Sequence, residues 1–252
     1  MYLKSYHKKR FAITAFSFLS SSFLPFSHNA IFANDIPQSF SNGGSTVGSV
    51  SGTDSMAIGR GASVNGTDSI SIGTQANASE HRTIAIGEQS AATNNEAISI
   101  GYSSAAGLRA TALGMNTSAS GDNSIAIGTS STASGSGAGA FGYQATANST
   151  NAYAIGKGSS ASGEGAMTLG VSASSSGNDS VAIGGQASAS GIDSVALGGN
   201  ASATAQNAYA IGKSASAGYS DSIALGSSAE TTASNQIVLG TSSETTIIKG
   251  DL

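Results

Sequence analysis

The chain has 252 residues, including 34 Gly, only 2 Pro and neither Cys nor Trp, and 10% of its residues are charged. Few side chains are therefore available for catalysis, and disulfides cannot hold the fold together. The net charge of −4 provides no basic surface, so we expect no nucleic-acid partner.

The N-terminus is typical of a secretory signal peptide. Basic residues within 4–10 precede an apolar stretch over 11–26, and small residues follow at Ala30 and Ala33. The apolar stretch is about 16 residues long, shorter than the roughly 20 that span a bilayer. We therefore predict a signal peptide at 1–33, cleaved after Ala33 or, alternatively, after Ala30, so that the mature chain starts at Asn34.

A glycine preceded by an aliphatic residue or Phe recurs through the rest of the chain. Twelve of the thirteen intervals between these repeat glycines are 14 residues long, and the interval from Gly101 to Gly114 is 13. A fixed period of this kind indicates stacked structural repeats. The repeat glycines are Gly59, Gly73, Gly87, Gly101, Gly114, Gly128, Gly142, Gly156, Gly170, Gly184, Gly198, Gly212, Gly226 and Gly240.

Each repeat glycine ends a predicted strand. The residues one and three before it are mostly apolar, as at Ile125 and Ile127, and a small residue such as Ala126 lies between them. Spacing of two predicts apolar side chains on one face of the strand and small ones on the other. We expect the apolar pair to fill the core, and the flat Ala/Ser face to allow close approach of a neighbour.

A second alternation of small residues follows each glycine, as at Ala145 and Ala147, and leads into a turn. We expect positive φ at turn glycines seven residues after a repeat glycine, and turns closed by Asp or Asn side chains five residues before the next one. The turn glycines are Gly66, Gly121, Gly135, Gly163, Gly177 and Gly191, and the Asp and Asn residues are Asp54, Asp68, Asn123, Asn151, Asp179, Asp193, Asn207 and Asp221.

Each unit is thus predicted to be one coil of strand, turn, strand and turn. Both prolines lie outside the repeats, as backbone pairing between stacked coils requires, and apolar residues at spacing two argue against helix. Fourteen coils at about 4.8 Å each span roughly 65–70 Å. The predicted shape is a short, narrow rod.

A single rod of this kind is thinly cored. Two buried aliphatic side chains per coil contribute roughly 3–6 kcal/mol, whereas ordering the backbone of a coil costs about 1–2 kcal/mol per residue. Backbone ladders and stacking recover part of the difference, and burial against identical neighbours supplies more. The sequence therefore predicts an obligate homo-oligomer.

The segments Asn123–Gly128 (NSIAIG) and Asp179–Gly184 (DSVAIG) resemble the head repeats of YadA-like trimeric autotransporter adhesins, and the resemblance covers about residues 45–240. It implies an all-β, left-handed parallel β-roll of about fourteen coils, assembled side by side as a homotrimer. It also implies a virulence-related adhesin head that binds a host extracellular matrix protein, collagen-like or fibronectin-like, or a cell-surface ligand.

The resemblance also implies a division of the chain. After the signal peptide come an N-terminal lead-in (34–44), the repeat β-roll (45–234) and a segment (235–252) with the last repeat strand and the start of a neck-like region. We expect neither the family's stalk nor its membrane anchor within this chain, because it contains no heptads and no amphipathic barrel strands. The chain is expected to be secreted, reaching the cell surface or outer membrane if joined to an anchor and the extracellular space otherwise.

Candidate chemical sites are few. His81 is the only histidine beyond the predicted signal peptide, and it lies beside Arg82 in a predicted turn. The simplest interpretation is a solvated pair of side chains, and a contact with a host ligand is the alternative. Gly137–Gly142 fits G-x-G-x-x-G, but no helical pattern follows it, and Gly139 is better explained as space for Phe141. We predict no catalytic, cofactor-binding or metal site, no cofactor and no enzymatic activity, and the repetition assigns no ligand-binding residues.

An adhesin head is therefore the favoured function. A non-adhesive structural spacer or a phage-fibre-like segment is the alternative, although a phage fibre would not need a signal peptide. Ice binding by a flat Ser/Thr/Ala face is a third hypothesis, disfavoured because no regular T-x-T ladder runs along the coils.

Overall fold

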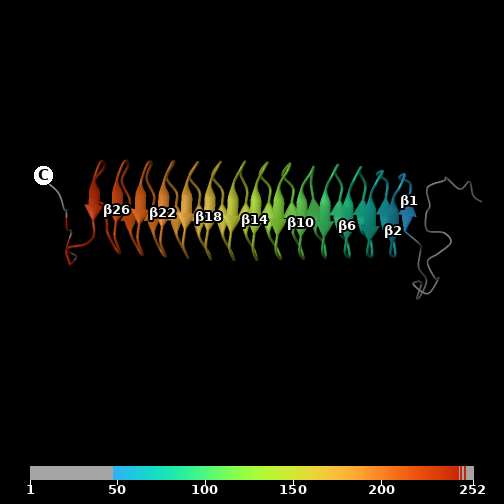
Figure 1. Cartoon of the computed structure of the whole chain (residues 1–252), viewed down its shortest axis with the longest axis horizontal. Coiled ribbons are helices and arrows are strands. Elements are labelled where there is room, and N and C mark those ends of the chain that lie inside the picture. The colour runs from blue at the N-terminus through green and yellow to red at the C-terminus, as the bar shows by residue number, and fades with distance from the viewer. Residues whose placement is uncertain (1–47, 244, 246, 248–252) are drawn as a thin grey trace, which may run out of the picture.

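The computed structural model describes residues 48–243, 245 and 247. These residues form a narrow rod of stacked coils, in which the chain advances coil by coil from one end to the other (Figure 1). The predicted signal peptide and the lead-in lie outside the described residues, as do residues 248–252 of the neck-like segment.

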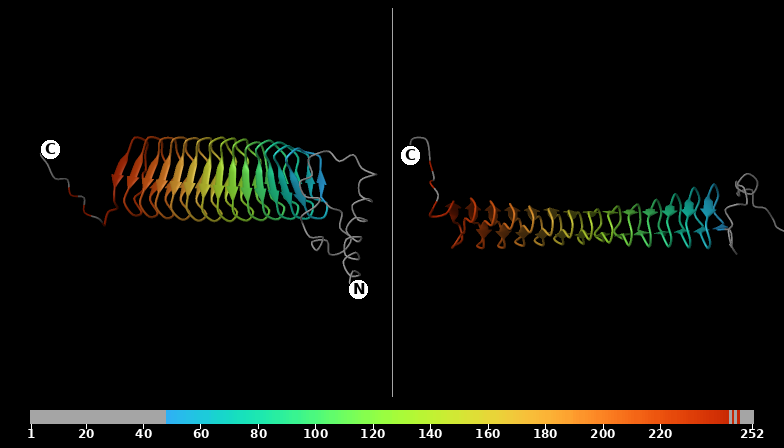
Figure 2. Two further views of the ribbon diagram at one scale, coloured as in Figure 1. Left: turned by 45° about the vertical axis from the view of Figure 1, so that its right-hand side comes forward. Right: turned by 90° about the horizontal axis from the view of Figure 1, so that it is seen from below.

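Two parallel sheets run the length of the rod, and each coil but the last adds a strand to both (Figure 2). The 14-stranded sheet consists of three-residue strands: β2 (Met56–Ile58), β4 (Ile70–Ile72), β6 (Ile84–Ile86), β8 (Ile98–Ile100), β10 (Thr111–Leu113), β12 (Ile125–Ile127), β14 (Gly139–Phe141), β16 (Tyr153–Ile155), β18 (Met167–Leu169), β20 (Val181–Ile183), β22 (Val195–Leu197), β24 (Tyr209–Ile211), β26 (Ile223–Leu225) and β27 (Ile237–Leu239).

The 13-stranded sheet consists of two-residue strands: β1 (Ser49–Val50), β3 (Ser63–Val64), β5 (Asn77–Ala78), β7 (Ala91–Ala92), β9 (Ala105–Ala106), β11 (Ser118–Ala119), β13 (Thr132–Ala133), β15 (Thr146–Ala147), β17 (Ser160–Ala161), β19 (Ser174–Ser175), β21 (Ser188–Ala189), β23 (Ser202–Ala203) and β25 (Ser216–Ala217). No helix occurs among the described residues. The predicted parallel β-solenoid, one coil per repeat, is confirmed.

Equivalent residues of successive repeats pair directly. Ala126 lies between Ala112 and Ala140 in the 14-stranded sheet. The 13-residue interval keeps this register, because Thr111 still pairs with Ile98 and the missing residue is taken from the turn around Gly107. Columns of equivalent residues therefore run along the whole rod.

The interior is made almost entirely of Ala and Ser. Val64 is the largest fully buried side chain among the described residues, and Ala126 is 0% exposed, whereas Ile127 is 37% exposed. The prediction that the aliphatic pair fills the core is therefore wrong: the small residues face inward and the aliphatic residues face outward. Short turns hold the two sheets so close that only methyl and hydroxymethyl groups fit between them.

Buried hydroxyl groups in this interior mostly bond to backbone carbonyls. Ser69 Oγ donates to Thr67 O at 3.0 Å and to Glu80 O at 2.8 Å, and Ser131 Oγ donates to Gly128 O at 2.8 Å. These bonds offset the cost of taking hydroxyls out of water. The hydroxyls of Ser71, Thr117 and Ser124 are the buried ones without a hydrogen-bond partner in the described region.

The glycines serve the turns in two different ways. Gly128 has φ 123°, and a Cβ there would lie 2.6 Å from Gly142 O of the next coil. The turn glycines do not have the predicted positive φ. A Cβ on Gly135 would lie 1.9 Å from Ser149 O, so close stacking requires this glycine.

The left-handed conformation in that turn falls two residues later. It is adopted by the Asp and Asn residues five before the repeat glycine, such as Asn123 at φ 57°. Asp and Asn tolerate this conformation better than most other non-glycine residues. Their side chains can bond between coils, as in the 2.8 Å bond from Asn207 Nδ2 to Asp221 Oδ1.

Candidate interaction surface

The largest apolar feature of the rod is the outer face of the 14-stranded sheet. Its aliphatic stripe consists of the residues three and one before each repeat glycine, in two parallel columns. Many of these side chains are substantially exposed, including Ile58 at 40% and Leu169 at 45%. The first column is Met56, Ile70, Ile84, Ile98, Thr111, Ile125, Gly139, Tyr153, Met167, Val181, Val195, Tyr209, Ile223 and Ile237; the second is Ile58, Ile72, Ile86, Ile100, Leu113, Ile127, Phe141, Ile155, Leu169, Ile183, Leu197, Ile211, Leu225 and Leu239.

The size of this stripe sets it apart from ordinary surface apolar residues. Fourteen strands at about 4.8 Å make it about 60 Å long, and a width of about 10 Å gives about 600 Å² even as a flat plane. The largest apolar patch on a typical monomer is about 300–600 Å² and is often functional. The estimated area lies at the upper end of that range, so the aliphatic stripe is the candidate interaction surface.

The coil with Gly139 and Phe141 departs from the aliphatic pattern, but its aromatic ring fills the space left by the glycine. A Cβ on Gly139 would lie 2.8 Å from Phe141 Cε2 and 2.8 Å from Tyr153 Cδ1. The rings of Phe141 and Tyr153 thus occupy the space that an aliphatic side chain would fill at Gly139. The prediction that Gly139 makes room for Phe141 is confirmed, and Tyr153 shares that space.

Two edges of turn residues border the stripe. The leading edge consists of the residues five before each repeat glycine, and the trailing edge of the residues one after it. The leading edge is Asp54, Asp68, Arg82, Glu96, Arg109, Asn123, Gly137, Asn151, Gly165, Asp179, Asp193, Asn207, Asp221 and Asn235; the trailing edge is Arg60, Thr74, Glu88, Tyr102, Met115, Thr129, Tyr143, Lys157, Val171, Gly185, Gly199, Lys213, Ser227 and Thr241.

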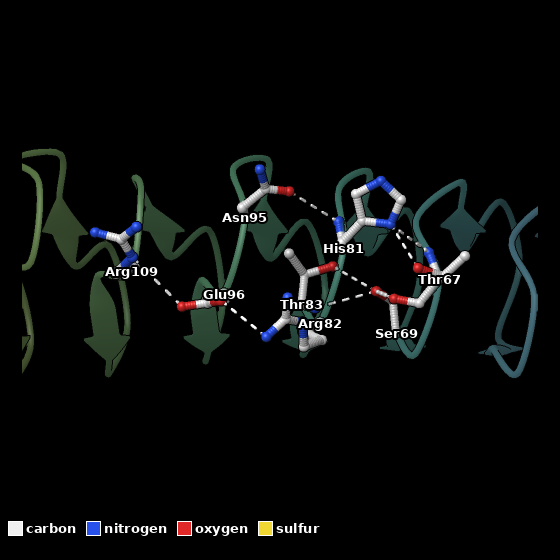
Figure 3. Close-up of polar contacts among 8 residues, drawn as sticks. All are labelled: Thr67, Ser69, His81, Arg82, Thr83, Asn95, Glu96 and Arg109. Carbon is white, nitrogen blue, oxygen red and sulfur yellow. Dashed lines mark hydrogen bonds and ion pairs between the residues drawn. The ribbon is translucent and has the colours of Figure 1, made fainter.

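Ion pairs within the described chain occur only on the leading edge. Glu96 lies between two arginines, with Arg82 Nη1 3.0 Å from Oε1 and Arg109 Nε 3.4 Å from Oε2 (Figure 3). More than half of each arginine side chain is exposed, so solvent screens these pairs and each contributes little stability. Across the stripe, Lys157 Nζ lies 5.9 Å from the ring centre of Tyr143.

The outer face of the 13-stranded sheet has a different character. Its hydroxyl column consists of the outward residue of each two-residue strand from β11 to β25, four residues after a repeat glycine. All eight carry a hydroxyl group: Ser118, Thr132, Thr146, Ser160, Ser174, Ser188, Ser202 and Ser216. The rod thus has one apolar sheet face and one small, polar sheet face.

His81 and Arg82 lie in one exposed turn, as predicted, and their side chains make different contacts. His81 Nδ1 lies 2.5 Å from Thr67 Oγ1, and the His81 backbone N–H donates to Asn95 Oδ1 at 3.2 Å (Figure 3). His81 is exposed, and within the described residues its hydrogen bonds are with Thr67 and Asn95 and not with a carboxylate. This geometry lacks the oriented base of a catalytic triad.

The remaining candidate features belong to the repeat architecture. Within Gly137–Gly142, residues Gly139–Phe141 form β14 and the last glycine is a repeat glycine. No group of three or more His, Cys, Asp or Glu residues suited to a metal ion occurs in the described region. An open hollow of about 430 Å³, lined in part by Ser228, Glu230 and Val238, lies at the C-terminal end of the stack. None of the described residues forms a helix long and apolar enough to cross a membrane.

Known proteins share the repeat. The YadA head domain repeat family matches the chain over residues 51–76 and 78–104 and in successive overlapping copies from 105 to 229. No curated protein matches this chain. Among solved structures, the chain is similar to the crystal structure of the collagen-binding domain of Yersinia adhesin YadA, with 28% identity and a TM-score of 0.44, covering 64% of this chain and 74% of that chain. The family match confirms the resemblance predicted from the repeat motifs.

Proposed function

Because this chain belongs to the family of YadA head domain repeats, we propose that it is the head of a cell-surface adhesin in which three copies assemble side by side. The assembled rod attaches to a host matrix protein, collagen-like or fibronectin-like, or to another cell-surface ligand. Residues 1–33 direct export and are removed, so that N-terminal sequencing of the secreted protein begins at Asn34.

The exposed aliphatic stripe is the observation that carries the assembly. Covering about 600 Å² of it per chain corresponds to about 15 kcal/mol at about 25 cal/mol per Å², before the entropic cost of association. This burial would add to that of the Ala-rich interior of each chain. Three copies with their stripes facing a common axis bury all three stripes at once, in keeping with the trimers that the family resemblance implies.

Burial of the stripe leaves the rest of each coil for ligand. The hydroxyl column and the exposed turns, including the successive turns that hold His81 and Asn95, face outward in such a trimer. Ligand then contacts many repeated, weak groups on three identical faces, and multivalency supplies the affinity that no single pocket provides.

Two measurements test this function. Sedimentation equilibrium of residues 34–252 is expected to give three times the chain mass, and a stable folded monomer would contradict the assembly. Binding of the same protein to immobilised collagen, immobilised fibronectin and cultured host cells tests adhesion, with Ile127→Asp combined with Ile155→Asp as the unassembled control. If an intact trimer binds none of the three surfaces, the adhesin proposal is contradicted and the structural-spacer hypothesis replaces it.

A further inference from the structure

The charges on the two edges of the aliphatic stripe are arranged in a complementary order. On the trailing edge, Arg60 belongs to the same coil as Asp54 of the leading edge, and the next coil carries Asp68 there. Glu88 likewise shares its coil with Arg82. The edges are therefore opposite in sign at both coils.

Most of these charges have no counter-ion among the described residues of their own chain. The ion pairs of the described region are those of Glu96 with Arg82 and Arg109, which leaves Arg60, Glu88, Asp54 and Asp68 unpaired. Asp54 and Asp68 also occupy equivalent positions of neighbouring coils, so their like charges repel each other unless a cation from outside the chain lies between them.

Symmetry determines what lies beside each edge in a side-by-side assembly. When copies are related by rotation about an axis parallel to the rod, every strand runs in the same sense around that axis. The trailing edge of one copy then meets the leading edge of the next. In a face-to-face pair of antiparallel rods, the coils of the two chains run in opposite order, so equivalent coils do not lie side by side along the edges.

We propose, on the basis of the trimer proposed above, that an inter-chain ion-pair ladder sets the coil register of the assembly. Arg60 of one chain lies between Asp54 and Asp68 of the next. By the same placement Glu88 of one chain lies between Arg82, which attracts it, and Glu96, which repels it, so Arg60 contributes most to the register. The partner recognised by these edges is a second copy of this chain in the same register.

Ion pairs that fix the coil register are useful in this rod because its apolar surface does not fix it. The aliphatic stripe repeats at every coil, so sliding one chain by one coil, about 4.8 Å, rebuilds nearly the same apolar contacts. Sliding by one coil in one direction moves Arg60 from between Asp54 and Asp68 to between Asp68 and Arg82. The attraction to Asp54 is then replaced by repulsion from Arg82. Charge pairs of this kind contribute specificity more than affinity.

Charge reversal tests the ladder. We expect Arg60→Asp to raise the trimer dissociation constant about tenfold at low salt, because three equivalent sites are lost at once, and to have little effect at 1 M salt. Lys157→Asp is the matched control: it is the same charge change on the same edge, opposite the neutral residues Asn151 and Gly165. Adding Asp54→Arg and Asp68→Arg to Arg60→Asp is expected to restore assembly.

Cysteine crosslinking tests the register separately, since the natural chain has no cysteine. Asn123→Cys on the leading edge is combined in turn with Met115→Cys, Thr129→Cys, Tyr143→Cys or Val171→Cys on the trailing edge. Disulfide-linked trimers are expected to be most abundant with Thr129→Cys or its neighbour Met115→Cys, and to fall to background with Val171→Cys.

The outcomes separate the two proposals. A monomeric wild-type protein overturns the proposed trimer. A wild-type trimer that tolerates Arg60→Asp as well as Lys157→Asp, that is not restored by the triple reversal, or that crosslinks best through Val171→Cys overturns the ladder alone.

Discussion

The two sheets of the rod share one interior and differ in what they present outside. Both place Ala and Ser inward, as at Ala126 and Ala133, each 0% exposed. Outside, the 14-stranded sheet carries the aliphatic stripe, whereas the 13-stranded sheet carries the hydroxyl column over eight of its strands. The difference supports the proposal that the first face contacts copies of the chain and the second faces water and ligand.

The comparison also shows how such a thin fold holds together. The small interior lets the two sheets lie close together, and backbone hydrogen bonds of ordinary length join successive coils along each sheet, as in the 2.9 Å bond from Ile125 N to Ala138 O. Burial of the aliphatic stripe between chains would add to the apolar burial within each chain. Assembly is therefore expected to raise the stability of each chain.

Filling the interior shared by both sheets is expected to have the largest effect. Ala126→Leu adds three carbons where neighbouring coils leave space for one methyl group, and we expect a loss of at least about 3 kcal/mol in the free energy of unfolding. Thermal unfolding followed by circular dichroism measures it. Ile127→Leu, one residue away on the outer face, is the control and should change stability by less than about 1 kcal/mol; equal effects would contradict an all-small interior.

Charging one outer face but not the other separates the two sheets directly. Ile127→Asp combined with Ile155→Asp removes two aliphatic side chains per chain, each contributing about 1.5–3 kcal/mol when buried, so the assembly is expected to dissociate. Sedimentation velocity measures this. Thr132→Asp combined with Thr146→Asp places the same charges on the hydroxyl column and should leave the oligomer intact. Dissociation by both pairs would show that the faces are not functionally distinct.

A smaller effect tests how evenly the stripe is packed. Gly139→Ile restores the common residue type at that position but collides with the rings of Phe141 and Tyr153, and overpacking of this kind costs about 1–3 kcal/mol. Adding Phe141→Ile should recover at least half of the lost stability, as measured by the unfolding midpoint. If the single variant is as stable as wild type, the compensation between these residues is absent.

The smallest expected effect concerns the leading edge. Arg109→Ala removes one of the two exposed ion pairs of Glu96, and such a pair contributes about 0.2–1 kcal/mol. Urea unfolding at low and high salt should show a loss within that range that shrinks at high salt. A loss above about 2 kcal/mol would mean that these charges have a structural role beyond a solvated edge.

Much of this fold could be predicted from the sequence. The glycine period gives the number of coils, the spacing of two gives the strands, and the absence of proline from the repeats is consistent with continuous backbone pairing. The orientation of the strands was predicted wrongly, because alternation identifies two faces without saying which is inside. Applying the rule that large apolar residues are buried placed Ile125 and Ile127 in the core.

A signal for the correct orientation is nevertheless present in the sequence. Interior positions of a narrow solenoid cannot vary in size, and the position of Ala126 holds Ala, Ser or Thr in every coil but the last, where it is Val238. The neighbouring column ranges from Gly139 to Tyr153, a variation that only an outer surface accommodates. Size constancy, rather than hydrophobicity, marks the core of this rod.

The interaction surface was only partly predictable. The oligomer expected from the thin core stays a prediction. The Ala/Ser face was wrongly chosen as the surface in contact with neighbours, because it lies inside the rod. The complementary edges require knowing that Arg60 and Asp54 lie on opposite sides of one exposed stripe. That knowledge comes from the register and exposure of the strands, not from the period.

Cysteine reactivity at three positions of one region tests the central claim, that the aliphatic stripe is external to each chain and covered by its copies. In separate variants, Ala126→Cys, Ile127→Cys and Thr132→Cys are labelled with a maleimide under native conditions, before and after dissociation by dilution. We predict that Ala126→Cys stays unreactive, Thr132→Cys reacts rapidly throughout, and Ile127→Cys changes from slow to rapid on dissociation. Rapid labelling of Ile127→Cys in the assembled protein, or no change on dissociation, would contradict the account.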